Sequence, residues 1–266
     1  MAASDSAELL DRAHRNLVES SRRLFALDPG AVVEAGERWL FGAGTPSHPV
    51  ISNAAFRLDD GLDGEELVAR AQEFFAPLGR GFAVWVRDGL EADMDLRAAA
   101  EDAGMEFVYA MPEMLLRERA EETSLPLGAE LRRLASPEQA RSYWRIAAEA
   151  YASIGLPPEV FGHYEDHRGL MADGVAAFLA YLDGKPVSIA MTIVSHRVAG
   201  VYWVGSLERA RGRGLGRAVT AAATNAGFDL GAELASLQAS PMGRPVYEAM
   251  GYVTAFDYRL LISPPR

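Results

Sequence analysis

The sequence predicts a mixed α/β (α+β) fold of two domains, each with a mixed, mostly antiparallel sheet flanked by helices. Its 266 residues exceed one average domain. Two apolar runs flank Asp183-Gly184, a strong β-hairpin signal, and a glycine-rich segment then separates a strand from a helix. A meander followed by a crossover indicates this fold class. We place the domains at residues 1–120 and 127–266, with a linker at 119–126.

The first domain is expected to begin with a helix, because apolar residues recur on one helical face between Leu9 and Leu24. A second amphipathic helix is predicted at residues 64–78, and a third at residues 93–103 ends at Gly104, where a left-handed cap is natural. Apolar runs predict strands at residues 32–41, 50–58, 82–87 and around 114–117.

The second domain is expected to open with a strand at residues 131–134 and a well-signalled helix. Ser136 is a good N-cap, Pro137 suits the first turn, and Gln139 completes a capping box. The following elements are strands at 175–182, 187–194 and 201–206, a helix at 215–230, a strand at 234–239, a short helix around 245–250 and a strand at 255–262.

Composition excludes several classes of protein. A formal net charge of −11 argues against a surface that wraps nucleic acid. No apolar run approaches the roughly 20 residues that span a bilayer, and the first residues lack a signal-peptide pattern, so we expect a cytoplasmic protein that does not bind membranes. The absence of cysteine excludes disulfides, thiolate metal sites and a cysteine nucleophile. The oligomeric state stays open.

The segment from Gly205 to Arg217 has the composition of a phosphate-binding loop. Its glycines let backbone N–H groups face a ligand, and the helix that follows adds unpaired donors and a positive dipole end. The Walker pattern needs a lysine that this loop lacks, and the dinucleotide pattern needs glycine where Arg217 stands. The plain alternative is a tight turn with solvated arginines. The basic side chains of this island are Arg209, Arg211, Arg213 and Arg217.

Two motifs in this half resemble those of the GNAT (GCN5-related N-acetyltransferase) family. Arg211-x-x-Gly214-x-Gly216 is similar to the R/Q-x-x-G-x-G/A pyrophosphate loop, and residues 238–252 resemble the N-x-x-A-x-x-x-Y-x-x-x-G-F stretch. In the second motif Ser240 replaces the usual asparagine and Gly243 the usual alanine, whereas Tyr247, Gly251 and Tyr252 keep the pattern. The resemblance covers residues 128–263.

This resemblance implies an acyltransferase that moves an acetyl group from acetyl-CoA to an amine. It implies that Tyr247 protonates the departing thiolate, for which the alternative is packing in the core. Backbone N–H groups of the strand at 201–206 would polarise the thioester carbonyl. The residues implied to contact the pantetheine arm are Val204, Gly205, Ser206 and Leu207. The amides implied to hold the pyrophosphate are those of Arg211, Gly212, Arg213, Gly214, Leu215 and Gly216. The other residues implied to bind the cofactor are Arg217, Ser240 and Tyr247, with the Tyr247 phenol near the sulfur.

The first domain is interpreted as a degraded repeat of the same plan. Ala103-Gly104-Met105 before a strand echoes Met250-Gly251-Tyr252 before the last strand. The loop that corresponds to the phosphate cradle, residues 59–66, is acidic and would repel a pyrophosphate. The alternative is an unrelated α/β domain.

A general base is not evident, since the strand at residues 201–206 carries no carboxylate. We expect Glu208 to pair with the neighbouring arginines, which leaves water or His163, Glu165 and His167 to accept the proton. His163 and His167 lack a third ligand, so no metal site is proposed. A non-catalytic CoA-binding or interaction module is the alternative function. The acceptor stays open among small amines, aminoglycoside-like polyamines, amino acids and protein N-termini.

Overall fold

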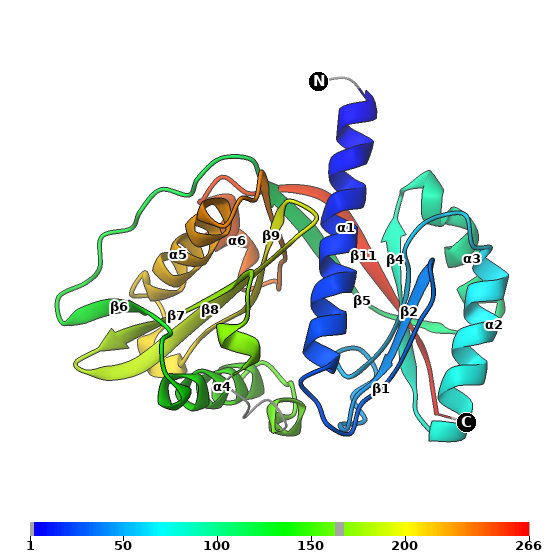
Figure 1. Cartoon of the computed structure of the whole chain (residues 1–266), viewed down its shortest axis with the longest axis horizontal. Coiled ribbons are helices and arrows are strands. Elements are labelled where there is room, and N and C mark those ends of the chain that lie inside the picture. The colour runs from blue at the N-terminus through cyan, green and yellow to red at the C-terminus, as the bar shows by residue number, and fades with distance from the viewer. Residues whose placement is uncertain (1–2, 163–167, 266) are drawn as a thin grey trace. The chain divides into compact units, whose positions relative to one another are not determined.

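The computed structural model describes residues 3–162 and 168–265 and contains two compact units (Figure 1). Unit 1 comprises the residues up to Ser20 and Met114–Val253, and unit 2 comprises Ser21–Glu113 and the residues from Thr254 onward. Each unit therefore draws on both halves of the chain. The predicted domains at residues 1–120 and 127–266 would each be one continuous segment of the chain, and this division stays a prediction.

Unit 1 is built on strands in the order β10-β9-β8-β7-β6, which are antiparallel except for the parallel pair β9 and β10. Helices α4 and α5 cover its two faces (Figure 1): Gly205 lies against Ala150 of α4, and Gly227 of α5 lies against Ala199. The elements are β6 (Ala129–Arg133), α4 (Pro137–Ala152), η3 (Pro158–Phe161), η4 (Gly169–Met171), β7 (Val175–Leu182), β8 (Lys185–Ser195), β9 (Val198–Ser206), η5 (Glu208–Ala210), α5 (Leu215–Asp229), β10 (Leu234–Gln238) and α6 (Arg244–Glu248).

The local signals of this half act as the sequence predicts. The Ser136 hydroxyl accepts a hydrogen bond from the Gln139 amide at 3.2 Å, and the Gln139 side chain accepts one from the Ala135 amide at 2.8 Å. Asp183 and Gly184 take positive φ angles of 50° and 75°, the values that a tight hairpin turn requires. The predicted linker has no regular structure, and Ala120 within it exchanges two hydrogen bonds with Asn225 of α5.

Helix α1 (Ala3–Phe25) is fastened to the β8–β9 hairpin of unit 1 by Asn16, which is fully buried. The Asn16 amide donates to the carbonyls of Ile193 and Val198, both at 3.0 Å. Its oxygen accepts from the Tyr202 hydroxyl at 2.7 Å. A side chain at Gly200 would occupy the place of the Asn16 oxygen, so this close approach requires glycine.

Unit 2 has the strand order β1-β2-β3-β4-β11, in which only β3 and β4 are parallel. The single strand predicted at residues 32–41 is wrong: it is a hairpin of β1 and β2, which turns at Gly36 beneath the Trp39 ring. The elements are β1 (Val32–Ala35), β2 (Trp39–Ala43), β3 (Asn53–Arg57), α2 (Gly64–Phe75), η1 (Ala76–Leu78), β4 (Phe82–Asp88), η2 (Glu91–Asp93), α3 (Met94–Asp102), β5 (Glu106–Leu116, which ends in unit 1) and β11 (Val253–Ser263).

The two halves of the chain repeat one order of elements. Three strands of a meander lead through a loop to a helix, then to a strand parallel to the third one, a short helix and a long strand. Gly104 and Gly251, which precede β5 and β11, both take positive φ angles, of 76° and 91°. This order supports the interpretation of the N-terminal half as a repeat, and it aligns residues 59–66 with the glycine-rich loop.

Candidate functional site

Strands β9 and β10 part after a short parallel contact. They are paired from Val198–Leu234 to Gly200–Ser236, and no pairing joins β9 to β10 beyond this point within the described residues. The register between β8 and β9 shifts between Ile189 and Met191, opposite Trp203, which takes a φ of +50°. The second half of β9 therefore has an edge without a strand partner, which an extended ligand can pair with.

The loop after β9 leaves a row of backbone donors free. Gly212 and Gly214 have φ angles of 72° and 78°, and the space where their side chains would stand is open. Helix α5 has no side-chain cap at its start. None of the six backbone N–H groups of residues 212–217 has a hydrogen-bond partner in the described part of the chain. These donors, together with the helix dipole, have the arrangement that binds anions at helix N-termini.

Two residues predicted to contact the ligand, Leu207 and Arg211, use their amides for hydrogen bonds within the protein. The Arg211 amide donates to the Glu208 carbonyl at 3.2 Å, and its guanidinium donates to the carbonyl of Ser206, at 3.2 Å, and to the end of α4. Leu207 donates its N–H to the Val187 carbonyl at 2.9 Å. Arg211 thus braces the loop, and the backbone donors for an anion begin at Gly212.

The basic island is smaller than the sequence suggests. Arg209 pairs with Glu149 at 3.0 Å, and Arg217 lies 3.8 Å from Glu121. The expectation that Glu208 pairs with the arginines is wrong, because these two carboxylates take that role. Arg213 is exposed and has no partner among the described residues, so it is the arginine whose charge is available to a ligand.

Tyr247 of α6 lies buried against Gly243, where a side chain would come within 2.8 Å of its ring. This contact explains the glycine that replaces the usual alanine. The Ser240 hydroxyl accepts a hydrogen bond from the Gly243 amide at 3.1 Å and so holds the turn before the helix. The Tyr247 hydroxyl makes no hydrogen bond to any described residue, and burial raises the pKa of this phenol.

Sequence reasoning missed two tyrosines of α4. The Tyr151 hydroxyl donates to the Val204 carbonyl at 3.1 Å, and the Tyr143 hydroxyl donates to the Trp203 carbonyl at 3.4 Å. The Tyr151 ring also packs edge-on against Trp203, with 5.4 Å between centroids. Helical periodicity marks these tyrosines as inward-facing and cannot show which strand they reach. The suggested bases His163, Glu165 and His167 lie outside the described residues.

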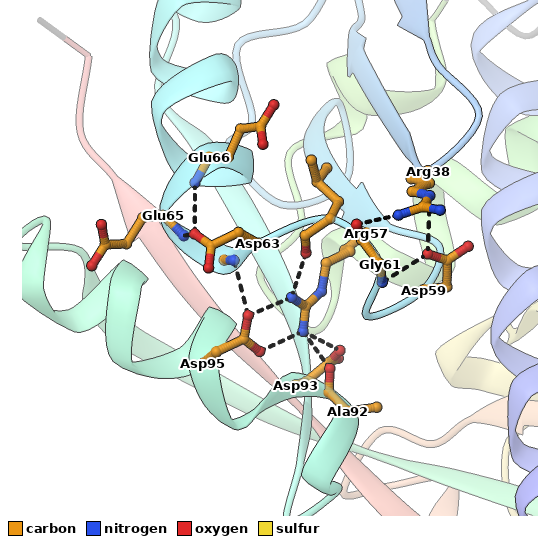
Figure 2. A network of polar contacts seen from close by, with 12 residues as sticks. Arg38, Arg57, Asp59, Gly61, Asp63, Glu65, Glu66, Ala92, Asp93 and Asp95 are labelled. Carbon is orange, nitrogen blue, oxygen red and sulfur yellow. Dashed lines mark hydrogen bonds and ion pairs between the residues drawn. The ribbon is translucent and has the colours of Figure 1, made fainter.

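In the corresponding loop of unit 2, carboxylates of the protein accept the hydrogen bonds of the backbone amides (Figure 2). The Asp63 carboxylate accepts hydrogen bonds from the amides of Glu65 and Glu66, at 2.9 and 3.3 Å. The Asp95 carboxylate accepts one from the Gly64 amide at 2.9 Å. The first turn of α2 is therefore capped by side chains of the protein, whereas that of α5 is not.

Arg57 holds this arrangement in place. Its side chain is fully buried and donates to both oxygens of Asp95, at 2.7 and 2.8 Å, and to Asp93 at 3.1 Å (Figure 2). It also donates to the Leu62 carbonyl at 2.8 Å. The hydrogen bonds from Arg57 lower the pKa of Asp95. The acidic residues of this region therefore cap the first turn of α2, in addition to the repulsion of a pyrophosphate that the sequence predicts.

Comparisons with known proteins agree with this geometry. The family model of the Acetyltransferase (GNAT) domain matches residues 113–239. This segment is therefore similar to a GNAT domain. A comparison with curated protein sequences finds no match. The matched segment includes β9, the glycine-rich loop and α5, and it ends before Ser240 and Tyr247.

The fold of the whole chain is that of solved GNAT proteins. It is similar to a GCN5-related N-acetyltransferase from Kribbella flavida, with 22% identity, a TM-score of 0.72 and 95% of each chain covered. One from Sphaerobacter thermophilus has 14% identity and a TM-score of 0.65, covering 88% of this chain and 82% of that one. A tandem GNAT protein from the clavulanic acid biosynthesis pathway has 14% identity and a TM-score of 0.62, covering 90% and 85%.

The described residues contain neither a membrane-spanning helix nor a cluster of metal ligands. No helix among them has the length and apolar character needed to cross a membrane. No group of three or more His, Asp or Glu side chains within residues 3–162 and 168–265 is arranged to hold a metal ion.

Replacing Gly214 by leucine should abolish CoA binding. The side chain would project into the open space beside the free amides, and the positive φ would be strained by about 1–2 kcal/mol. Gly184→Leu is the matched control, because Gly184 has a φ of 75°, equally open surroundings and a place in the β7–β8 turn. Calorimetric titration with CoA should show binding in the control alone. Equal CoA affinity in both variants would contradict the site.

Replacing Asp95 by asparagine should destabilise unit 2 at neutral pH by about 1–2 kcal/mol, because Arg57 loses an ionised partner. The pKa of Asp95 is lowered in the folded state, so its contribution is present above its ordinary value near 3.8 and is lost as the pH falls below it. Denaturant unfolding at several pH values should show the gap from wild type closing below about pH 4.

Glu66→Gln is the control for this experiment, because the exposed pair of Glu66 with Arg70 contributes less than about 1 kcal/mol. A stability difference for Asp95→Asn that stays constant between pH 7 and pH 3 would show that the charge of Asp95 is not what stabilises unit 2.

Proposed function

We propose that unit 1 transfers an acetyl group from acetyl-CoA to an amine on a small molecule. The observation that carries this proposal is the row of six free N–H groups at residues 212–217, next to the unpaired edge of β9. A pyrophosphate needs several donors at one point, and a pantetheine arm needs an extended backbone to pair with. Both features lie on consecutive segments of the chain, as an elongated donor with one charged end requires.

In this proposal, the pantetheine arm pairs with the backbone between Val204 and Ser206, and the pyrophosphate binds the amides from Gly212 to Arg217. The exposed Arg213 supplies a positive charge to the phosphates. Leu207 and Arg211 serve the site indirectly, since their amides are engaged within the protein. The donor's reactive end then lies beside the Trp203–Gly205 backbone, where N–H groups would stabilise the developing oxyanion.

Tyr247 is proposed as the general acid that protonates the departing thiolate. Its hydroxyl has no competing acceptor among the described residues, and burial raises its pKa, so the phenol stays protonated throughout the neutral range. A higher pKa makes the phenol a weaker acid. Apolar surroundings also raise the pKa of a thiol, so the departing thiolate is a stronger base here than in water.

Proton removal from the amine is proposed to go through water, because β9 carries no carboxylate between Val201 and Ser206. The competing function is a CoA-binding module without turnover. Incubation with acetyl-CoA and a panel of amines, followed by release of free thiol, separates the two. The panel should contain small amines, amino acids, polyamines and peptide N-termini. We also propose that the protein is located in the cytoplasm.

Tyr247→Phe should lower kcat on the order of a hundredfold and leave the Kd for CoA nearly unchanged, because the ring keeps its packing while the proton is lost. The measurement uses the best amine of the panel under conditions where chemistry limits the rate. Tyr181→Phe is the control, since Tyr181 is a buried tyrosine of β7 that packs with Arg132. A wild-type rate in Tyr247→Phe would make Tyr247 structural and assign the proton to water.

A further inference from the structure

Strand β9 adopts a strained backbone where the acyl group is proposed to lie. Trp203 has a φ of +50°, a conformation that is strained for a residue other than glycine. The register with β8 pairs Tyr202 and Gly205 but neither Trp203 nor Val204, so β8 does not define the orientation of the peptide groups at these two residues. Other contacts must therefore hold this segment in one conformation.

Helix α4 supplies such contacts through its two tyrosines. The Tyr151 hydroxyl donates to the carbonyl of Val204 at 3.1 Å, and the Tyr143 hydroxyl donates more weakly to the carbonyl of Trp203 at 3.4 Å. These carbonyls belong to two consecutive peptide groups. The C=O and N–H of a trans peptide point in opposite directions, so a hydroxyl that holds the carbonyl also sets the direction of the N–H.

We infer that Tyr151, assisted by Tyr143, positions the peptide groups between Trp203 and Gly205 so that their donors face the thioester carbonyl. The inference rests on the proposed function and adds two positioning residues to it. Preorganised backbone donors stabilise an oxyanion because they need no reorientation during the reaction. A looser bulge would still bind the donor's pantetheine and phosphates, but it would polarise the carbonyl less.

Tyr151 and Tyr247 then have different roles despite being the same residue type. The Tyr151 proton is committed to the Val204 carbonyl, whereas the Tyr247 hydroxyl has no acceptor among the described residues. The Tyr151 ring packs against Trp203 and Phe161, with centroid distances of 5.4 and 5.6 Å. Phenylalanine at position 151 would keep this packing and remove only the hydrogen bond.

The test is the carbonyl signal of bound [1-¹³C]acetyl-CoA, read by ¹³C NMR and isotope-edited infrared spectroscopy, which requires no knowledge of the acceptor. Tyr151→Phe should bind acetyl-CoA within about threefold of the wild-type Kd, lose most of the carbonyl shift, and lower kcat about tenfold to a hundredfold. Tyr143→Phe should change the signal in the same direction by less, since its hydrogen bond is longer. Tyr181→Phe should match wild type.

Thermal unfolding of each variant shows whether the fold is retained, and Tyr143→Phe provides the same readout if Tyr151→Phe does not fold. Normal binding with an unchanged carbonyl signal in both variants would overturn this inference alone. Failure of the wild-type chain to bind acetyl-CoA would overturn the proposed function and this inference together.

Discussion

The candidate site depends on the backbone donors at the start of α5 having no acceptor within the described protein. Most helices cap their first turn with a side chain, but α5 begins after Gly214 at a φ of 78° and has no side-chain cap. Residues 212–214 are exposed, so water can satisfy their three donors when no anion is bound. An anion bound here would be attracted mainly by backbone dipoles and by Arg213, which allows binding in a chain whose net charge is −11.

The N-terminal half has the same order of elements and the opposite solution at the equivalent turn. Asp63 and Asp95 accept hydrogen bonds from the backbone amides at the start of α2, and Arg57 holds Asp95 in position by donating hydrogen bonds to its carboxylate. Filling the turn with internal carboxylates stabilises unit 2 and leaves no row of donors for a phosphate. One supersecondary plan thus gives a scaffold or a ligand site, depending on a few residues in the loop before the helix.

Local signals predicted much of this structure. The Ser136 cap, the Asp183-Gly184 turn and the end of α3 at Gly104 each depend on residues close in sequence, and the glycine-rich loop was identified by its spacing. Long-range contacts were not predictable. The Arg211 side chain donates hydrogen bonds to Ala150 and Ser153 at the end of α4, and its position in the loop did not predict these partners. The local sequence likewise does not indicate the contact of Tyr151 with β9 or the pairing of β11 with β4.

The most direct test of the account follows the backbone amides themselves. In a ¹H–¹⁵N correlation spectrum of the deuterated chain, titration with CoA should shift the signals of Gly212, Gly214 and Gly216, whose glycine resonances are well separated from most others. The amides of Gly64, Glu65 and Glu66, which are already capped, should not move. Shifts at the start of α2 without shifts at the start of α5 would contradict the central claim that the uncapped turn binds the phosphates.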